Sequence, residues 1–145
     1  MEGIKSNYKI LQISTAMTQE EKQLLLKDLC ARLPYGVMIQ ITSDGGMVEA
    51  YYDMRLDAGL LADLLHSEDD FKPYLRPMSS MTEKESKEYR MFIDYSYNDF
   101  TSESTPCVYV DKIENYIDWL NEHQFDFRGL IGKGLALEAP EEMYE

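Results

Sequence analysis

Apolar residues alternate with other residues most regularly between positions 37 and 55. Every second position of the first half is a branched apolar residue, which is the period of a β-strand with one buried face. Asp44-Gly45 follows, and glycine there tolerates the positive φ angles of a tight turn. The pattern predicts an antiparallel hairpin over residues 37–55 that turns at Asp44-Gly45, with Gln40 and Thr42 less buried than the branched positions. Those buried positions are Val37, Ile39 and Ile41.

A helical pattern precedes the hairpin, from residue 18 to about residue 33. Thr18 and Glu21 have the spacing of a capping box, in which each side chain bonds the backbone amide of the other residue. Pro34 and Gly36 then end the helix. Its apolar residues recur at i, i+4 and i+7 and predict a buried stripe. That stripe contains Leu26, Cys30 and Leu33.

Three further helices follow from the same reasoning. Asp57 is expected to cap a helix through Leu65, and Asp111 a helix from residue 112 to about 123. Thr82 and Glu85 form a second capping box, which opens a helix to about residue 95. The predicted buried residues are Leu60, Leu61, Leu64 and Leu65 in the first of these helices and Ile113, Tyr116, Ile117 and Leu120 in the last.

The remaining segments complete the expected fold. Tyr8–Ser14 is predicted to be a short strand or extended arm, Cys107–Val110 a strand and Ser96–Thr105 a loop. The prolines of Lys72–Pro77 exclude regular helix there. We therefore expect an α+β fold, in which a small, mainly antiparallel sheet is covered by about four helices. Residues 1–17 would form an N-terminal strand or extended arm, and residues 18–145 a single domain.

The formal net charge of −13 changes the picture of possible partners. A surface this acidic repels phosphates, so direct binding of DNA or RNA is disfavoured. An acidic face attracts a basic protein instead, including one that normally holds DNA. The alternative is that the acidity serves only solubility.

The sequence pattern indicates neither a membrane protein nor an exported one. No uncharged run approaches the roughly 18 residues of a membrane-spanning helix. The first residues also lack the apolar core of a signal peptide. Cys30 and Cys107 are isolated thiols without a paired spacing. We therefore expect a cytoplasmic protein with reduced cysteines and no membrane partner.

Two metal-binding patterns are incomplete. His66 with the acidic run 68–70 lacks a second ligand at helical spacing, which favours a solvated loop. The segment Asp94–Asp99 resembles the start of a calcium loop, but Asp99 stands where that loop needs glycine. We expect no metal ion and no cofactor.

A Cys–His nucleophile is the remaining catalytic candidate. It would need Cys30 or Cys107 beside His123, with Asp126 orienting the histidine. Both cysteines instead occupy positions that the pattern predicts to be core, with Cys30 buried and neither within reach of His123. We expect no catalytic residue, so an enzyme of unrecognised type remains the weakest alternative.

The segment Asp118–Pro140 combines large aromatic residues with three glycines. This composition predicts a tightly folded clasp, with its tryptophan and both phenylalanines in the core. Two arginines lie in aromatic turns, one here and one between the prolines at 73 and 77. Arginine there can hold a carboxylate, a phosphate or a carbonyl, or pair internally with Asp126 or a helix C-terminus. The candidate ligand- or partner-binding residues are Tyr74, Arg76, Trp119, His123, Asp126 and Arg128.

Specific strings in these segments resemble a family of small uncharacterised proteins. They are Lys72–Glu83, Asp118–Asn121, Phe125–Ile131 and Gly134–Pro140, and the helix Lys22–Gly36 is similar as well. The family is encoded by phages and mobile elements of gut Bacteroidales. The resemblance covers most of residues 18–144. It implies a genomic setting and no activity.

Two kinds of function remain open. The first is a non-catalytic intracellular interaction protein, phage-encoded and acting on a host component, whose acidic surface attracts a basic protein. The second is a binder of a small anion or nucleotide, in which Arg76 and Arg128 hold the ligand between Tyr74 and Trp119. A deep pocket with converging arginines would favour the second function, and a flat acidic face the first.

Overall fold

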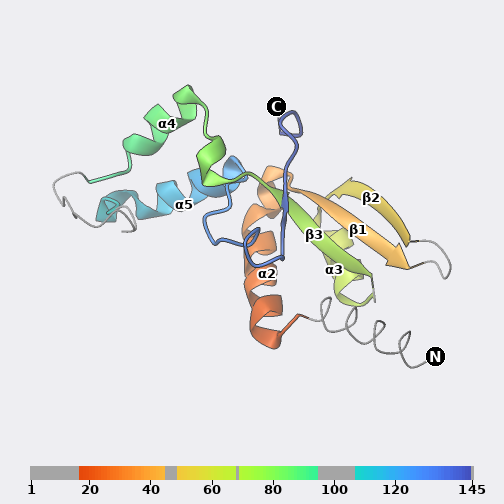
Figure 1. Ribbon diagram of the computed structural model, residues 1–145. Coiled ribbons are helices and arrows are strands. Elements are labelled where there is room, and N and C mark those ends of the chain that lie inside the picture. Colours follow the sequence, from red (N-terminus) through yellow and green to blue (C-terminus); the bar gives the residue numbers. More distant parts are fainter. Residues whose placement is uncertain (1–16, 45–48, 68, 95–106, 145) are drawn as a thin grey trace.

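A computed structural model describes residues 17–44, 49–67, 69–94 and 107–144 of the chain (Figure 1). This part forms one compact α+β body, as predicted, with a four-stranded sheet in the order β2-β1-β3-β4. No helix within it is long and apolar enough to cross a membrane. The predictions for residues 8–14 and 96–105 lie outside the described residues. The four α-helices of the described part are α2 (Gln19–Arg32), α3 (Ala58–Leu65), α4 (Glu83–Arg90) and α5 (Ile113–Glu122).

The predicted hairpin is confirmed. Strand β1 (Met38–Asp44) pairs antiparallel with β2 (Glu49–Arg55) from Met38↔Arg55 to Asp44↔Glu49. Residues 45–48, which include most of the predicted turn, lie outside the described residues. Val37, Ile39 and Ile41 are buried, whereas Gln40 and Thr42 are partly exposed, so the predicted period is also confirmed.

Strand β3 (Asp70–Leu75) lies on the other side of β1 and pairs with it antiparallel. It contains the first part, up to Leu75, of the segment Lys72–Pro77 in which the sequence excluded helix. Strand β4 (Leu137–Glu138) pairs with the end of β3 in parallel, which makes the sheet mixed but mostly antiparallel. A proline within a paired strand is unusual, because Pro73, opposite Ile39, has no N–H to donate.

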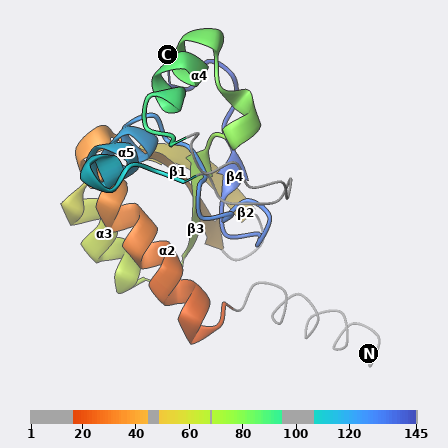
Figure 2. The same ribbon diagram turned by 90° about the vertical axis from the view of Figure 1, so that its left-hand side faces the viewer.

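Helices α2 and α3 cover one face of this sheet, as the two perpendicular views show (Figures 1 and 2). Their buried leucines meet apolar residues of β1 and β3 in the main hydrophobic core. This burial is the principal stabilising contribution to such a fold, at about 1.5–3 kcal/mol for each large apolar side chain. In α3, Leu61 and Leu64 are buried and Leu60 partly so, but Leu65 is exposed, contrary to prediction.

The capping box of α2 is confirmed, but its predicted buried stripe is wrong. Thr18 and Glu21 bond each other's backbone amides at 3.1 and 3.0 Å. Cys30 and Leu26 are exposed, and Leu33 alone of the predicted stripe packs, partly buried, against the core. The buried face contains Leu25, Asp28, Leu29 and Arg32. The hydrophobic pattern treats Asp28 and Arg32 as charged residues facing solvent. In the fold they form a fully buried ion pair, so the side of α2 that carries them faces the interior.

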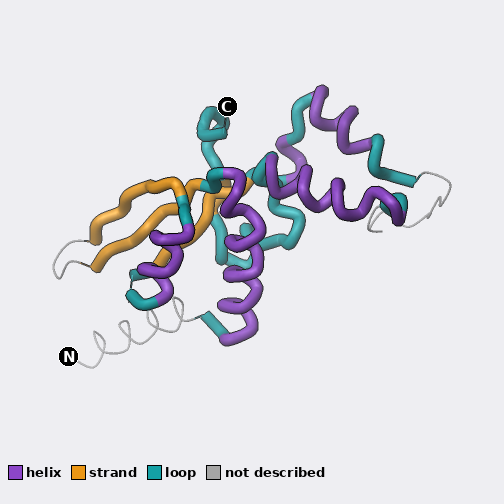
Figure 3. Tube along the Cα trace, turned by 180° about the vertical axis from the view of Figure 1, so that it is seen from behind, coloured by secondary structure: helices purple, strands orange, loops and turns teal. Residues whose placement is uncertain are grey.

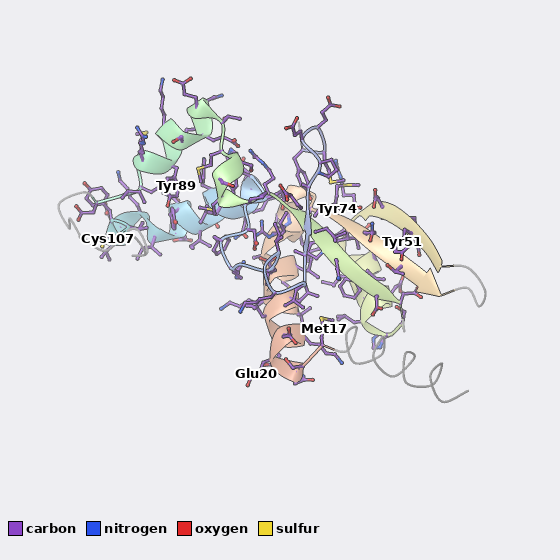
Figure 4. All side chains as sticks on the ribbon, viewed as in Figure 1. Met17, Glu20, Tyr51, Tyr74, Tyr89 and Cys107 are labelled. Carbon is purple, nitrogen blue, oxygen red and sulfur yellow. The ribbon has the colours of Figure 1, made fainter. Side chains whose placement is uncertain are left out.

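Helices α4 and α5 lie side by side, away from the sheet (Figures 1 and 3). A second, mainly aromatic cluster joins them, and Figure 4 labels one member, Tyr89. The predicted capping box of Thr82 and Glu85 is confirmed, and α4 ends at Arg90. Buried members of this cluster are Trp119, Leu120 and Phe125, with Tyr89, Phe92, Tyr116, Ile117 and Phe127 among those packed against them.

The approach to α5 differs from the sequence prediction. Cys107–Val110 is not a strand, because only an isolated bridge, Ile93↔Val108, forms there. A 3-10 turn, Val110–Lys112, then leads into α5, whose N-cap is Lys112 and not Asp111. Ile113 is exposed, although the pattern placed it on the buried face.

The C-terminal segment folds as the predicted clasp. Phe125 forms a parallel bridge with Arg76, so this segment lies beside the chain just after the end of β3. Gly129 and Gly134 have φ values of 73° and 75°, a left-handed conformation that glycine adopts without strain. Trp119 and Phe125 are buried, as expected, and Phe127 packs partly buried against the aromatic cluster.

Candidate functional site

A cleft of about 660 Å³ opens where four parts of the chain meet. They are the segment that leads from β3 to α4, the first turns of α4, the C-terminal end of α5 and the C-terminal residues 138–144. We call it the junction cleft. Figure 1 shows the segment entering α4 and the C-terminal segment converging beyond the end of β3. Its acidic, basic and histidine lining residues are Arg76, Lys84, Glu85, Glu88, His123, Glu138 and Glu141.

Arg76 is fixed by a carboxylate of the same chain. Its two terminal nitrogens each donate to one oxygen of Glu85 at 2.7 Å, a bidentate pair. The guanidinium also lies 4.3 Å from the centre of the Phe125 ring. Hydrogen bonding from Arg76 lowers the pKa of Glu85 to about 2. The positive charge of Arg76 is therefore neutralised within the fold.

Trp119 and His123 form the α5 side of the site. The Trp119 indole donates its N–H to Glu88 at 2.9 Å, and its ring lies 4.4 Å from that of His123. His123 Nδ1 lies 2.8 Å from the Trp119 carbonyl oxygen. Because a carbonyl only accepts, Nδ1 carries the proton, and Nε2 is the nitrogen that accepts when the ring is neutral. Glu88 thus links the cleft to the tryptophan.

The charge balance of the junction cleft is acidic. Four glutamates line it, against one arginine and one lysine. The charges of Arg76 and Glu85 cancel, Lys84 offsets one of the three other glutamates, and Glu88 accepts the hydrogen bond from Trp119. Glu138 and Glu141 are exposed on the rim, close to solvent and to any approaching molecule. A cationic group is therefore favoured in this cleft and an anion is disfavoured.

Tyr144 anchors the C-terminal wall of the cleft. Its hydroxyl donates to the Tyr74 carbonyl at 2.6 Å and accepts from the Met38 amide at 2.9 Å. Burial raises the pKa of Tyr144 to about 12, so the hydroxyl stays protonated and can donate. The same residue lines a second cavity on its other side, next to Arg55. The position of the rim glutamates thus depends on this anchor.

The structure separates the six candidate residues. Arg76 and His123 line the junction cleft, and Trp119 reaches it through Glu88. Tyr74 lies on the sheet, where its hydroxyl donates to Asp53 at 2.7 Å and accepts from Gln40 (Figure 4).

Asp126 and Arg128 lie in the clasp and hold the fold together. The Asp126 carboxylate accepts from the backbone amides of Leu130 and Ile131 at 2.8 and 3.0 Å. Arg128 donates to the buried Asp28 at 2.7 Å, which confirms the expected internal pairing, although the partner is Asp28 and not Asp126. Neither residue lines the junction cleft.

Sequence reasoning missed several residues of these networks. Asp28 and Arg32 are opposite charges at i and i+4, a spacing that could have indicated their pairing. Nothing in the sequence distinguishes Tyr144 from the other tyrosines. Glu88, Glu138 and Glu141 were hidden because acidic residues are abundant throughout the chain.

The catalytic and metal candidates are placed as follows. Cys30 and Cys107 are both exposed and form no disulfide, so the expected core position of each is wrong. Among the described residues, no group of three or more histidine, cysteine, aspartate or glutamate side chains could hold a metal ion. Most of the calcium-like segment 94–99 lies outside the described residues.

Comparison with known proteins gives no further information on the site. No family model, no curated protein and no solved structure matches this chain.

Proposed function

We propose that this chain is a non-catalytic cytoplasmic interaction protein, and that its junction cleft receives a basic segment of a partner protein. The observation that supports this most is the acidic lining of the cleft, whose arginine is already bound by Glu85. A lysine or arginine side chain entering there would meet Glu88, Glu138 and Glu141. The resemblance to a phage-encoded family suggests a host component as the partner.

The same contacts favour this function over binding of a small anion. An anion at Arg76 would have to displace a bidentate carboxylate held by two 2.7 Å bonds. Arg128 bonds Asp28 and is not among the residues lining the cleft, so the two arginines do not converge on one ligand. An anion held by both arginines would therefore break two internal ion pairs, whereas a cation bound by the glutamates of the cleft breaks no ion pair.

Long-range electrostatics supports the same partner chemistry. The net charge of −13 attracts a basic partner before contact, which raises the association rate and makes it depend on salt. The rigid surroundings of the cleft then supply the local specificity. Arg76 is stacked on Phe125 and holds Glu85, Trp119 bonds Glu88, and Tyr144 fixes the C-terminal wall, so these parts of the cleft are in place before the partner arrives.

The test uses Trp119, the single tryptophan of the chain, as the reporter. The full chain is titrated with an arginine-rich peptide and with a glutamate-rich peptide of equal length. We expect the basic peptide alone to change the Trp119 fluorescence, because the indole bonds a carboxylate of the cleft. Binding should weaken as salt is raised. Equal binding of both peptides would contradict the proposal.

Variants of the two exposed glutamates of the cleft distinguish binding in the cleft from attraction by the overall negative charge. E138Q/E141Q should weaken binding of the basic peptide by roughly two- to thirtyfold, since exposed charge pairs contribute about 0.2–1 kcal/mol each. E20Q/E114Q changes the net charge equally at exposed positions on α2 and α5 that do not line the cleft. An equal loss of affinity in this control would mean that overall charge, and not the cleft, binds the peptide.

A further inference from the structure

A second cavity, also of about 660 Å³, shares Tyr144 with the junction cleft. We call it the Arg55 cavity. The ends of α2 and α5 meet there, beside the start of β1 (Figures 1 and 3). A cavity of this volume is typical of small-ligand sites, which combine apolar walls with a few polar groups. The apolar walls of this one are formed by Leu33, Pro34, Met38, Leu56 and Met143.

Arg55 is the cation of this cavity, and its charge is not used within the described part of the chain. Every ion pair of that part involves another arginine, Arg32, Arg76 or Arg128. The Arg55 side chain makes no hydrogen bond with a described residue. It lies against Gly36, whose φ is 69° and where a Cβ atom would be 3.4 Å from the arginine Nε. A guanidinium with free N–H groups is suited to a bidentate carboxylate.

Groups of the opposite charge come from the end of α5. Glu122 lines the cavity, is exposed and forms no ion pair with Arg55. Gln124, which is 1% exposed, donates its Nε2 to the Tyr35 carbonyl at 3.0 Å, and its buried Oε1 accepts from no described group. The C-terminal end of a helix also carries a partial negative charge. This side of the cavity therefore favours an ammonium group.

We propose that the Arg55 cavity binds a small zwitterion, an amino acid or short peptide with both a free carboxylate and a free ammonium group. Arg55 holds the carboxylate, the α5 side holds the ammonium group, and the apolar walls receive an aliphatic side chain. An anion alone is disfavoured because Asp57 and Glu122, the two acidic residues of the lining, outnumber the arginine. A simple cation would be repelled by Arg55.

This site is separate from the one in the proposed function. Neither Arg55 nor Glu122 lines the junction cleft, and Tyr144 is the one residue that lines both. Binding of a zwitterion and binding of a basic peptide can therefore each fail while the other holds.

Calorimetric titration of the full chain tests the class of ligand. Leucine and the dipeptide leucyl-leucine are the zwitterionic probes, isocaproate lacks the ammonium group of leucine, and isoamylamine lacks its carboxylate. We expect a zwitterion to bind, and both analogues to bind about tenfold more weakly or worse, because each loses a hydrogen bond between charged groups. The two zwitterions distinguish an amino acid from a peptide. Binding of neither, or an analogue that binds as tightly, would overturn the proposal.

Variants with matched controls then locate the ligand. R55Q and E122Q should each weaken binding of the zwitterion about tenfold or more, because each removes the partner of one ligand charge. R90Q and E114Q make the same changes of charge at exposed positions of α4 and α5 that do not line the cavity, and they should bind as the unmodified chain does. Urea unfolding checks that all four variants are folded. R55Q or E122Q that binds as tightly as its control would overturn the proposal.

Discussion

At the scale of single residues, the buried carboxylate of Asp28 connects α2 to the C-terminal segment. It accepts from Arg32 at 2.9 Å and from Arg128 at 2.7 Å, and it is 0% exposed. Arg32 also donates to the Phe125 carbonyl at 2.7 Å, and both guanidinium groups lie against the Phe127 ring. A buried charge is tolerated only when it is paired in this way. The clasp is therefore fixed to α2 by charge as well as by apolar contact.

Glu85 gives a prediction about pH at this scale. Its pKa in the fold is about 2, against an ordinary value near 4.5, because Arg76 stabilises the carboxylate. The unfolded chain thus binds more protons between these values, and stability is lost as the pH falls through this window. We expect E85Q to lower the free energy of unfolding at neutral pH by up to about 3 kcal/mol.

Urea unfolding followed from pH 7 to pH 2 measures this effect. The difference between the unmodified chain and E85Q should shrink as the pH falls, while E114Q, an exposed control on α5, should follow the unmodified chain throughout. A difference that does not depend on pH would show that the Arg76–Glu85 pair is not its origin.

At the scale of elements, the pairing of β1 with β3 is completed by the side chain of Tyr144. Their pairing reaches Ile39↔Pro73, and the proline has no N–H. One residue further on, the Tyr144 hydroxyl bonds the Met38 amide and the Tyr74 carbonyl. The tyrosine therefore takes the place of a ladder hydrogen bond and ties the C-terminal residues to the sheet.

We expect Y144F to destabilise the chain by about 1–3 kcal/mol, because it leaves a backbone donor and acceptor unpaired in a largely buried place. Chemical unfolding gives the magnitude, and faster hydrogen exchange at the Met38 amide gives the location. Y109F removes a hydroxyl from an exposed tyrosine and should have little effect. Unchanged exchange at Met38 in Y144F would contradict this interpretation.

At the scale of the whole molecule, the C-terminal segment joins the two hydrophobic clusters. Leu130, Leu135 and Ala136 are part of the core between the sheet and α2, whereas Phe125 belongs to the aromatic cluster of α4 and α5. The same segment supplies β4 and one wall of the junction cleft. It is therefore part of the fold and not an appendage.

Deletion of residues 125–145 should abolish cooperative unfolding. The deleted apolar residues each contribute roughly 1.5–3 kcal/mol when buried, against a typical domain stability of about 5–15 kcal/mol. Calorimetry of the truncated chain measures this directly, and F125A in the full chain should lower the melting temperature without removing the transition. A sharp melt of the truncated chain near the parent temperature would show that the segment is dispensable.

Local features of the fold followed from the sequence alone. The capping boxes at Thr18 and Thr82 and the period of β1 are all confirmed. Each depends on residues only a few positions apart, which is why the sequence was enough to predict them. The sequence also indicated that Trp119 and Phe125 are buried, because large aromatic side chains are costly to leave in water. The α+β class then followed from the number and type of these elements.

Only the tertiary structure decided which face of α2 is buried and where the cleft lies. The buried face of α2 packs Leu25 and Leu29 into the core and pairs Asp28 with Arg128, 100 positions away, and no local pattern contains these partners. The junction cleft likewise combines residues from Arg76 to Tyr144, and β4 is too short to have a period of its own. A hydrophobic pattern reports the average environment of a residue type. A buried ion pair departs from that average, because its desolvation is offset by partners that only the folded chain brings together.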